Sequence, residues 1–164
     1  MIAFLKQSLI FLHLNLVGFW KSCQEQIWDR HKNLPADLPK KNGQTLVITG
    51  GGRGIGYEAV HKLLKLGYYV ILGVRKPQDV TEKINKQPSF EGSFEAFELD
   101  LTSLDSVRNF AQQILAKNMP INVLINNAGI MFGPRRESKD GFELQLATNH
   151  LGHFLLTHLL LPKV

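Results

Sequence analysis

Three short segments carry residue types and spacings that could do chemistry. They are residues 49–56 (Thr-Gly-Gly-Gly-Arg-Gly-Ile-Gly), the run Asn126-Asn127-Ala128-Gly129, and Asn149. The first lies between a strand-like and a helix-like stretch. A helix N-terminus offers free N–H groups to an anion, and glycines let the backbone approach it closely. The segment is typical of a turn that binds a dinucleotide pyrophosphate, with a tight turn that holds no ligand as the alternative. No Lys-Ser or Lys-Thr follows it, so it is not a Walker-type P-loop.

Alternating strand-like and helix-like stretches must position these segments. Strands separated by helices pair in parallel through right-handed crossovers, so we expect an α/β fold. The prediction is a Rossmann-type doubly wound parallel sheet, of which the N-terminal four-strand half is present. Strands are expected at residues 45–48, 69–72, 94–99 and 121–125, the last of them buried. Helices are expected from residue 55 to a stop at Gly67, around residues 80–84, from an N-cap at Ser103 to Asn118, and over residues 144–161.

The glycine spacing Thr-Gly-x-x-x-Gly-x-Gly resembles that of the short-chain dehydrogenase/reductase family. Three further motifs, in the family's order, extend the resemblance over residues 45–161. Asp100-Leu101 looks like the pair that contacts the adenine. Residues 124–129 look like the fourth-strand motif, which supports the sheet and touches the cofactor. Residues 148–157 look like the helix that carries the family's Asn. Their sequence is most similar to that of the retinol dehydrogenase branch, including the polyprenol dehydrogenase type.

The resemblance implies a nicotinamide dinucleotide as cofactor. Its expected contacts are Gly50, Arg53, Gly54, Ile55, Gly56, Arg75, Asp100, Leu101, Asn126, Ala128 and Gly129. An NAD site places an acid at the end of the second strand, but this strand ends in Arg75. Arg75 and Arg53 could pair with the 2′-phosphate of NADP, so we predict NADP rather than NAD. Alternatively, each arginine is an ordinary solvated surface charge.

Catalysis in the family uses a Ser, a Tyr and a Lys four residues after that Tyr. Asn149 stands where the family has the Asn that links this Lys to water, which implies a catalytic role for it. The other three have no counterpart. The residues four positions after Tyr57, Tyr68 and Tyr69 are His, Leu and Gly, and no strand that could carry the Ser is expected after the last helix. We therefore expect a C-terminally truncated chain, as a fragment, splice product or gene model. It should bind the cofactor weakly and show no appreciable catalysis.

The intact enzyme implied by the resemblance interconverts an alcohol and a carbonyl on a lipid-like substrate of the retinoid, polyprenol or steroid class. Two other hypotheses stay open. One is a catalytically silent chain that binds NADP or interferes with a full-length relative. The other is a chain that does not fold stably.

The first 20 residues are mostly apolar and end in an aromatic pair before Lys21. We predict that residues 1–20 form an apolar helix that acts as a membrane anchor or signal-anchor. A cleaved signal peptide and a soluble amphipathic helix are the alternatives. Residues 21–43 are predicted to be a linker, and residues 44–164 an NADP-binding Rossmann half-domain. Basic residues after the segment favour a domain that faces the cytosol, at the endoplasmic reticulum or a lipid droplet.

Composition excludes several other classes of protein. The 164 residues are 44% hydrophobic and 20% charged, which is not a disordered composition. The net charge of +5 is spread out, with no basic run interleaved with aromatics, so we expect no nucleic-acid partner. The single cysteine allows no internal disulfide or paired-cysteine zinc site.

A few other side chains have ordinary explanations. We expect no metal at the histidines of the last helix, which should pack or cap instead. The pair Arg135-Arg136 is predicted to be solvated, with a substrate or lipid contact as the alternative. The leucines near the end of that helix should pack on the sheet or at a homo-oligomer interface. The histidines in question are His150, His153 and His158.

Overall fold

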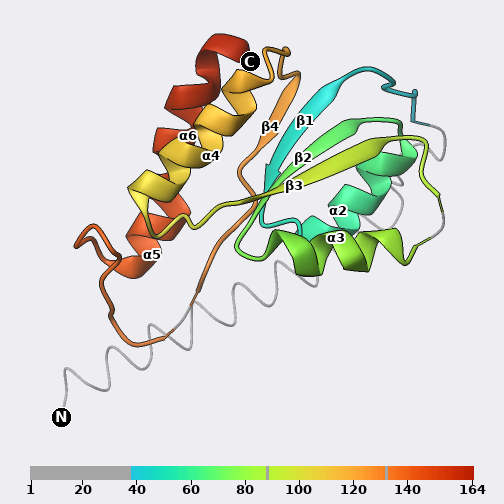
Figure 1. Cartoon of the computed structure of the whole chain (residues 1–164). Coiled ribbons are helices and arrows are strands. Elements are labelled where there is room, and N and C mark those ends of the chain that lie inside the picture. Colours follow the sequence, from blue (N-terminus) through green and yellow to red (C-terminus); the bar gives the residue numbers. More distant parts are fainter. Residues whose placement is uncertain (1–37, 88, 132) are drawn as a thin grey trace, which may run out of the picture. The chain divides into compact units, whose positions relative to one another are not determined.

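Four parallel strands form one sheet with helices on both faces (Figure 1). The computed structural model describes residues 38–87, 89–131 and 133–164, and residues 39–164 form one compact unit. The strands are β1 (Thr45–Thr49), β2 (Tyr69–Val74), β3 (Ser93–Glu98) and β4 (Val123–Ile125), in the order β3-β2-β1-β4. The helices are α2 (Gly54–Lys65), α3 (Pro77–Asn85), α4 (Leu104–Ala116), α5 (Leu144–Leu146) and α6 (Gly152–Leu160). The predicted α/β fold is confirmed.

Neighbouring residues of each central strand pack into different cores, one on each face of the sheet. Leu46 and Ile48 of β1 pack with α2 and α3, whereas Val47 packs with α4 and α6. Figure 1 shows the same division, with α2 and α3 on one side of the sheet and α4 and α6 on the other. Because β1 and β2 are covered on both faces, their side chains are almost wholly buried, as expected for central strands of a doubly wound sheet.

Local sequence signals explain where the helices begin and end. Ser103 caps α4, since its hydroxyl accepts a hydrogen bond from the Ser106 N–H at 3.4 Å. The Asp140 carboxylate accepts the Leu104 N–H at 2.8 Å, which satisfies a further free donor of the same helix end. Gly67, with a φ of +86°, ends the helical stretch before β2, as the sequence predicts.

The fourth strand is shorter and less buried than its sequence indicates. Residues 121 and 122 are not part of β4. The Ile121 N–H donates to the Lys163 carbonyl at 2.7 Å, and the Asn122 side chain accepts the Thr45 N–H at 2.8 Å. All three residues of β4 are only half-buried, so the prediction of a buried strand is wrong. The physical reason is that, among the strands formed by the described residues, β4 lies at the edge of the sheet and pairs with β1 alone.

The last helix contains a wider turn that the sequence does not indicate. Helical structure runs from Leu144, as predicted, but residues Ala147–Leu151 form a π-helix, η2, between α5 and α6. A short 3₁₀ turn, η3 (Leu161–Lys163), contains Pro162 and follows α6. A π turn inserted in a helix is rare and is frequently found at functional sites. Asn149 lies within this one.

The predicted N-terminal anchor, residues 1–20, lies outside the described residues, as do residues 21–37 of the predicted linker. Within the part of the chain that is described, no helix is both long and apolar enough to pass through a membrane. Residues 40 and 41 are attached to the sheet domain. The Lys40 ammonium donates to the Lys65 carbonyl at 3.0 Å, and the Lys41 N–H donates to the Leu66 carbonyl at 2.7 Å.

Candidate cofactor-binding site

The predicted site segments leave the sheet at one common edge. The register pairs Thr49 with Gly73, Gly73 with Phe97, and Ile48 with Ile125. All four strands are parallel, so the loops that follow their carboxyl ends lie together. In open α/β sheets, ligands bind at this edge where the chain connections diverge. The divergence here falls between β1 and β4, since β1 connects to α2 on one face while α4 leads into β4 from the other.

The glycine turn is built around close backbone contacts. Gly50 has a φ of +73°, and a Cβ there would lie 2.8 Å from the Ala128 Cα. At Gly56, a Cβ would lie 2.5 Å from the Gly50 carbonyl oxygen and would overlap the Asn127 amide. Gly51 and Gly52 are equally tight against side chains of the core. The glycines therefore bring the turn, α2 and the loop after β4 closer together than any other residue would allow.

The start of α2 is open to a ligand. Arg53 is the N-cap, but its side chain makes no capping hydrogen bond, and the first turn of α2 contains no acidic residue. Arg53, Gly54 and Ile55 are all exposed, with Ile55 at 85%. The unpaired N–H groups and the helix dipole fit a phosphate group.

Arg53 and Arg75 are both exposed and both follow strand ends at this edge. Lys83 of α3 is a third cation near the turn, which sequence reasoning missed. Its ammonium lies 3.6 Å from the centre of the Tyr57 ring and 3.5 Å from the Gly52 carbonyl oxygen. No spacing in the sequence would have singled out Lys83, because only the packing of α3 beside α2 brings it to the turn.

Asp100 and Leu101 follow β3 and differ in the groups that a ligand could contact. The Asp100 carboxylate accepts hydrogen bonds from the Thr102 N–H at 3.0 Å and the Thr102 hydroxyl at 2.7 Å. Burial raises the pKa of Asp100, but these bonds and the nearby Lys139 ammonium outweigh it, so the net pKa is lowered. The Leu101 side chain is buried in the core, so Leu101 can meet a ligand only through its backbone.

The run after β4 is held by the last residue of β1. The Thr49 hydroxyl accepts the N–H groups of Asn127 and Ala128, each at 3.0 Å. The Asn127 amide donates to the Thr49 carbonyl at 2.8 Å, and the Asn126 amide donates to the Thr157 hydroxyl of α6 at 3.0 Å. Asn126 and Asn127 therefore fix the loop, while Gly129 stays exposed at the edge.

Asn149 faces the same loop from the π turn. Its side chain accepts the Ile130 N–H at 2.9 Å and donates to the Ile130 carbonyl at 2.8 Å. Both ends of the amide are used, so its orientation is fixed. A hollow of about 340 Å³ opens beside it, between the loop after β4 and the last helix. Its lining is Asn126, Ala128, Asn149, His150, His153, Phe154 and Thr157.

The three histidines of the last helix differ in their surroundings. His153 is buried and lies 2.9 Å from the Thr49 hydroxyl, measured from Nε2. His150 lines the hollow beside Phe154, and His158 is exposed. No group of three or more potential metal ligands occurs in the described ranges. Arg135 and Arg136 are exposed in the loop before α5.

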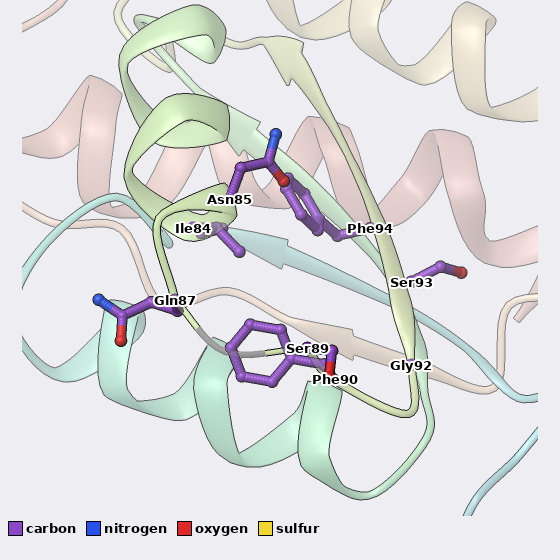
Figure 2. A pocket seen from close by; sticks show the side chains of 8 residues that line it. All are labelled: Ile84, Asn85, Gln87, Ser89, Phe90, Gly92, Ser93 and Phe94. Atoms are coloured by element: carbon purple, nitrogen blue, oxygen red, sulfur yellow. The ribbon is translucent and has the colours of Figure 1, made fainter.

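A second hollow, of about 360 Å³, lies between the end of α3 and the start of β3 (Figure 2). None of its lining side chains is charged. Because Ser93 begins β3, this hollow is at the edge of the parallel sheet opposite the glycine turn. It therefore belongs to a different part of the molecule from the predicted cofactor contacts.

The family model described as short chain dehydrogenase matches residues 44–164, which include every segment of the site. The chain belongs to the short-chain dehydrogenase family. Two curated relatives place it in the branch of the family that the sequence indicates. Polyprenol dehydrogenase of Danio rerio is 44% identical over 154 residues, covering 92% of this chain and 47% of the relative. Retinol dehydrogenase 14 of Homo sapiens is 42% identical over 161 residues, covering 88% and 48%.

Two solved structures share this fold. A metagenomic short-chain oxidoreductase crystallised with NADP has a TM-score of 0.62 and 31% identity, over 74% of this chain and 57% of that one. An uncharacterised protein of Mycobacterium paratuberculosis has a TM-score of 0.69 and 45% identity, over 78% of this chain and 45% of that one. The chain spans about half the length of the curated relatives described above.

Proposed function

We propose that this chain is the NADP-binding part of an oxidoreductase that interconverts an alcohol and a carbonyl group. One observation carries the proposal: the glycine turn, Arg75, Asp100 and the run ending in Gly129 all leave the sheet at one edge. The solved relative with NADP bound supports a nicotinamide dinucleotide as the ligand. NADP rather than NAD is favoured by two exposed arginines and by the absence of an acid at the end of β2.

The residues present fit the parts of this cofactor. The open start of α2 and the close-packed glycines suit the pyrophosphate. Arg53 and Arg75 would pair with the 2′-phosphate through charge-assisted hydrogen bonds. Asp100 and the Leu101 backbone would meet the adenine, and the loop from Asn126 to Gly129 would meet the nicotinamide end. When bound, this cofactor supplies or accepts the hydride that changes the oxidation state of the substrate carbon.

Proton transfer needs groups beyond those of the cofactor site. Asn149 is held in a fixed orientation on Ile130, beside the hollow where a substrate would approach. Among the three tyrosines of the 164 residues, none has a Lys four positions later. We propose that these residues by themselves bind NADP and do not turn over a substrate. The alternative function is that of a catalytically inactive chain that binds NADP. The lack of a Lys four positions after any of these tyrosines favours it.

The substrate class and the membrane attachment are inferred from other features. The polyprenol and retinol dehydrogenases among the relatives support a lipid-like alcohol or carbonyl compound as substrate. The apolar residues 1–20 would hold the chain on a membrane with its sheet domain facing the cytosol. Flotation with lipid vesicles tests the attachment. The full chain should rise with the vesicles, whereas a chain that lacks residues 1–20 should stay at the bottom of the gradient. Flotation of both forms alike would contradict it.

Thermal melting of the 164-residue chain tests cofactor binding. At about 100 times the dissociation constant, a ligand that binds only the folded chain adds about 2.7 kcal/mol to its stability. We expect NADPH to raise the melting temperature more than NADH at equal concentration. Arg53→Ala should reduce the NADPH effect, whereas Arg108→Ala should not. Arg108 is a suitable control because it is an exposed arginine of α4 that pairs with Asp105. An NADPH melting curve identical to that of the free chain would contradict the proposal.

A further inference from the structure

Thr49 and His153 form a buried hydrogen bond that joins the end of β1 to α6. The Thr49 Oγ1 lies 2.9 Å from the His153 Nε2. Thr49 has no exposed surface, and His153 is 6% exposed. His153 is not among the expected cofactor contacts, but it lies four residues after Asn149 on the same helical stretch. A buried polar pair at this position needs an explanation of its own.

The neighbours of Thr49 determine which partner donates. A hydroxyl has one proton and two lone pairs. The Thr49 oxygen accepts the N–H groups of Asn127 and Ala128, so both lone pairs are used. The hydroxyl proton is then free to point only at the His153 Nε2. This nitrogen is therefore the acceptor and carries no proton.

The second ring nitrogen leads to the same tautomer. The His153 Nδ1 lies 3.3 Å from the backbone carbonyl oxygen of Asn149, which can only accept. Nδ1 must therefore carry the proton. Burial lowers the pKa of the His153 imidazole, and the hydrogen bond to Asn149 offsets this only in part. The ring is accordingly neutral near pH 7, with its single proton on Nδ1.

We propose that His153, as the neutral Nδ1–H tautomer, is a positioning residue that fixes Asn149 relative to the end of β1. This rests on the proposed function, in which Asn149 belongs to the catalytic site. Hydrogen bonds run in one direction from the Ala128 N–H to Thr49, then to His153, and then to the Asn149 carbonyl. The Asn149 side chain in turn hydrogen-bonds to the backbone of Ile130, which lies two residues after Ala128, so the chain of hydrogen bonds returns to the same loop. The π turn is thereby held to the loop after β4 at both the backbone and the side chain of Asn149.

The tautomer can be measured directly by NMR. A long-range ¹H–¹⁵N spectrum of the full chain, labelled at histidine, distinguishes the two ring nitrogens. We expect His153 to be neutral at pH 7, with the proton on Nδ1 and Nε2 unprotonated. A ring protonated on Nε2, or on both nitrogens, would overturn the proposal. This measurement requires no variant and no cofactor.

Amide hydrogen exchange at Ile130 tests the positioning. The Ile130 N–H is bonded to the Asn149 side chain, so it reports how firmly Asn149 is held. His153→Leu should speed this exchange about tenfold, and His153→Gln, which keeps a donor and an acceptor, should speed it less. The exposed His158→Gln is the matched control and should leave it unchanged. Unchanged exchange at Ile130 in His153→Leu, or an equal increase throughout β2, would show that His153 does not position Asn149.

The effect on ligand binding should also be local. Because Asn149 faces the loop that would meet the nicotinamide end, His153→Leu should weaken NADPH binding more than His153→Gln does. Both variants should bind 2′,5′-ADP, which is the adenine half alone, as the unaltered chain does. Equal weakening of both ligands would overturn the positioning role. If the unaltered chain binds neither ligand, the proposed function fails, and the cofactor-free tautomer and exchange measurements still decide the role of His153.

Discussion

Gly50 lies directly against Ala128, so that a Cβ added to Gly50 would come within 2.8 Å of the Ala128 Cα. This contact joins the glycine turn after β1 to the loop after β4. The same glycine has a φ of +73°, which disfavours other residues. The closeness of the two loops, and not only the freedom of the turn, therefore requires glycine at position 50.

Gly50→Ala should destabilise the chain through both the contact and the backbone conformation. We expect a loss of about 2–4 kcal/mol in the free energy of unfolding, measured by urea denaturation. Gly43→Ala is the matched control. Gly43 has a φ of +80° but no atom within 4 Å of an added Cβ, so it should lose only about 1 kcal/mol. Equal losses in the two variants would mean that the contact with Ala128 is relieved at no cost.

Thr49→Val should be more damaging than its small change in shape suggests. Valine keeps the volume but removes the hydroxyl that bonds Asn127, Ala128 and His153. Leaving these groups unpaired should cost about 2–4 kcal/mol. Thr49→Ser keeps the hydroxyl, loses one methyl group and should cost about 1 kcal/mol. If the two variants unfold at the same urea concentration, the hydroxyl network does not contribute to stability.

The stability of the chain should fall in mild acid because of His153. Its pKa in the folded chain is lowered below the ordinary value of 6.5, so the unfolded chain binds a proton more readily. This contribution is fully present above about pH 6.5 and is lost as the pH falls below that value. Urea denaturation at pH 7 and at about pH 5.5 should show a larger loss for the unaltered chain than for His153→Leu. The same loss in both would contradict this source of acid sensitivity.

Arg75→Asp should shift the cofactor preference toward NADH. The substitution removes a cation suited to the 2′-phosphate and adds the carboxylate that NAD sites use for the ribose hydroxyl. We expect the ratio of NADPH to NADH affinity to fall at least about tenfold, measured by calorimetric titration of the full chain. Arg108→Asp, which makes the same change in net charge at an exposed position of α4, should leave the ratio unchanged. Equal ratios in the Arg75→Asp and unaltered chains would rule out a 2′-phosphate contact at Arg75.

Much of the fold could be predicted because its signals are local. The branched residues of β1, the cap at Ser103 and the stop at Gly67 mark their elements within a few residues. The early start predicted for β4 fails because the Ile121 N–H bonds to Lys163 and because the Asn122 side chain, in place of a backbone carbonyl, accepts the N–H of Thr45 in β1. Those partners are distant in the sequence, so no local pattern could have indicated them.

The candidate site likewise contains residues that could be predicted from local sequence and residues that could not. The glycine turn and the run after β4 could be identified because each is a continuous segment with a known physical task. Lys83 and the role of His153 could not, since both depend on packing between elements that are far apart in the sequence. The π turn at Asn149 also has no sequence signal, although the bonds from its side chain to Ile130 accompany it.

The most direct test of the cofactor site is an NMR titration of the ¹⁵N-labelled 164-residue chain with NADPH. If one site spans the carboxyl edge of the sheet, amide signals should shift in the glycine turn, at Arg75, at Asp100 and in the loop ending at Gly129. NADH should shift the signal of Arg75 less. No shifts, or shifts confined to the hollow lined by residues between 84 and 94, would contradict the proposed site.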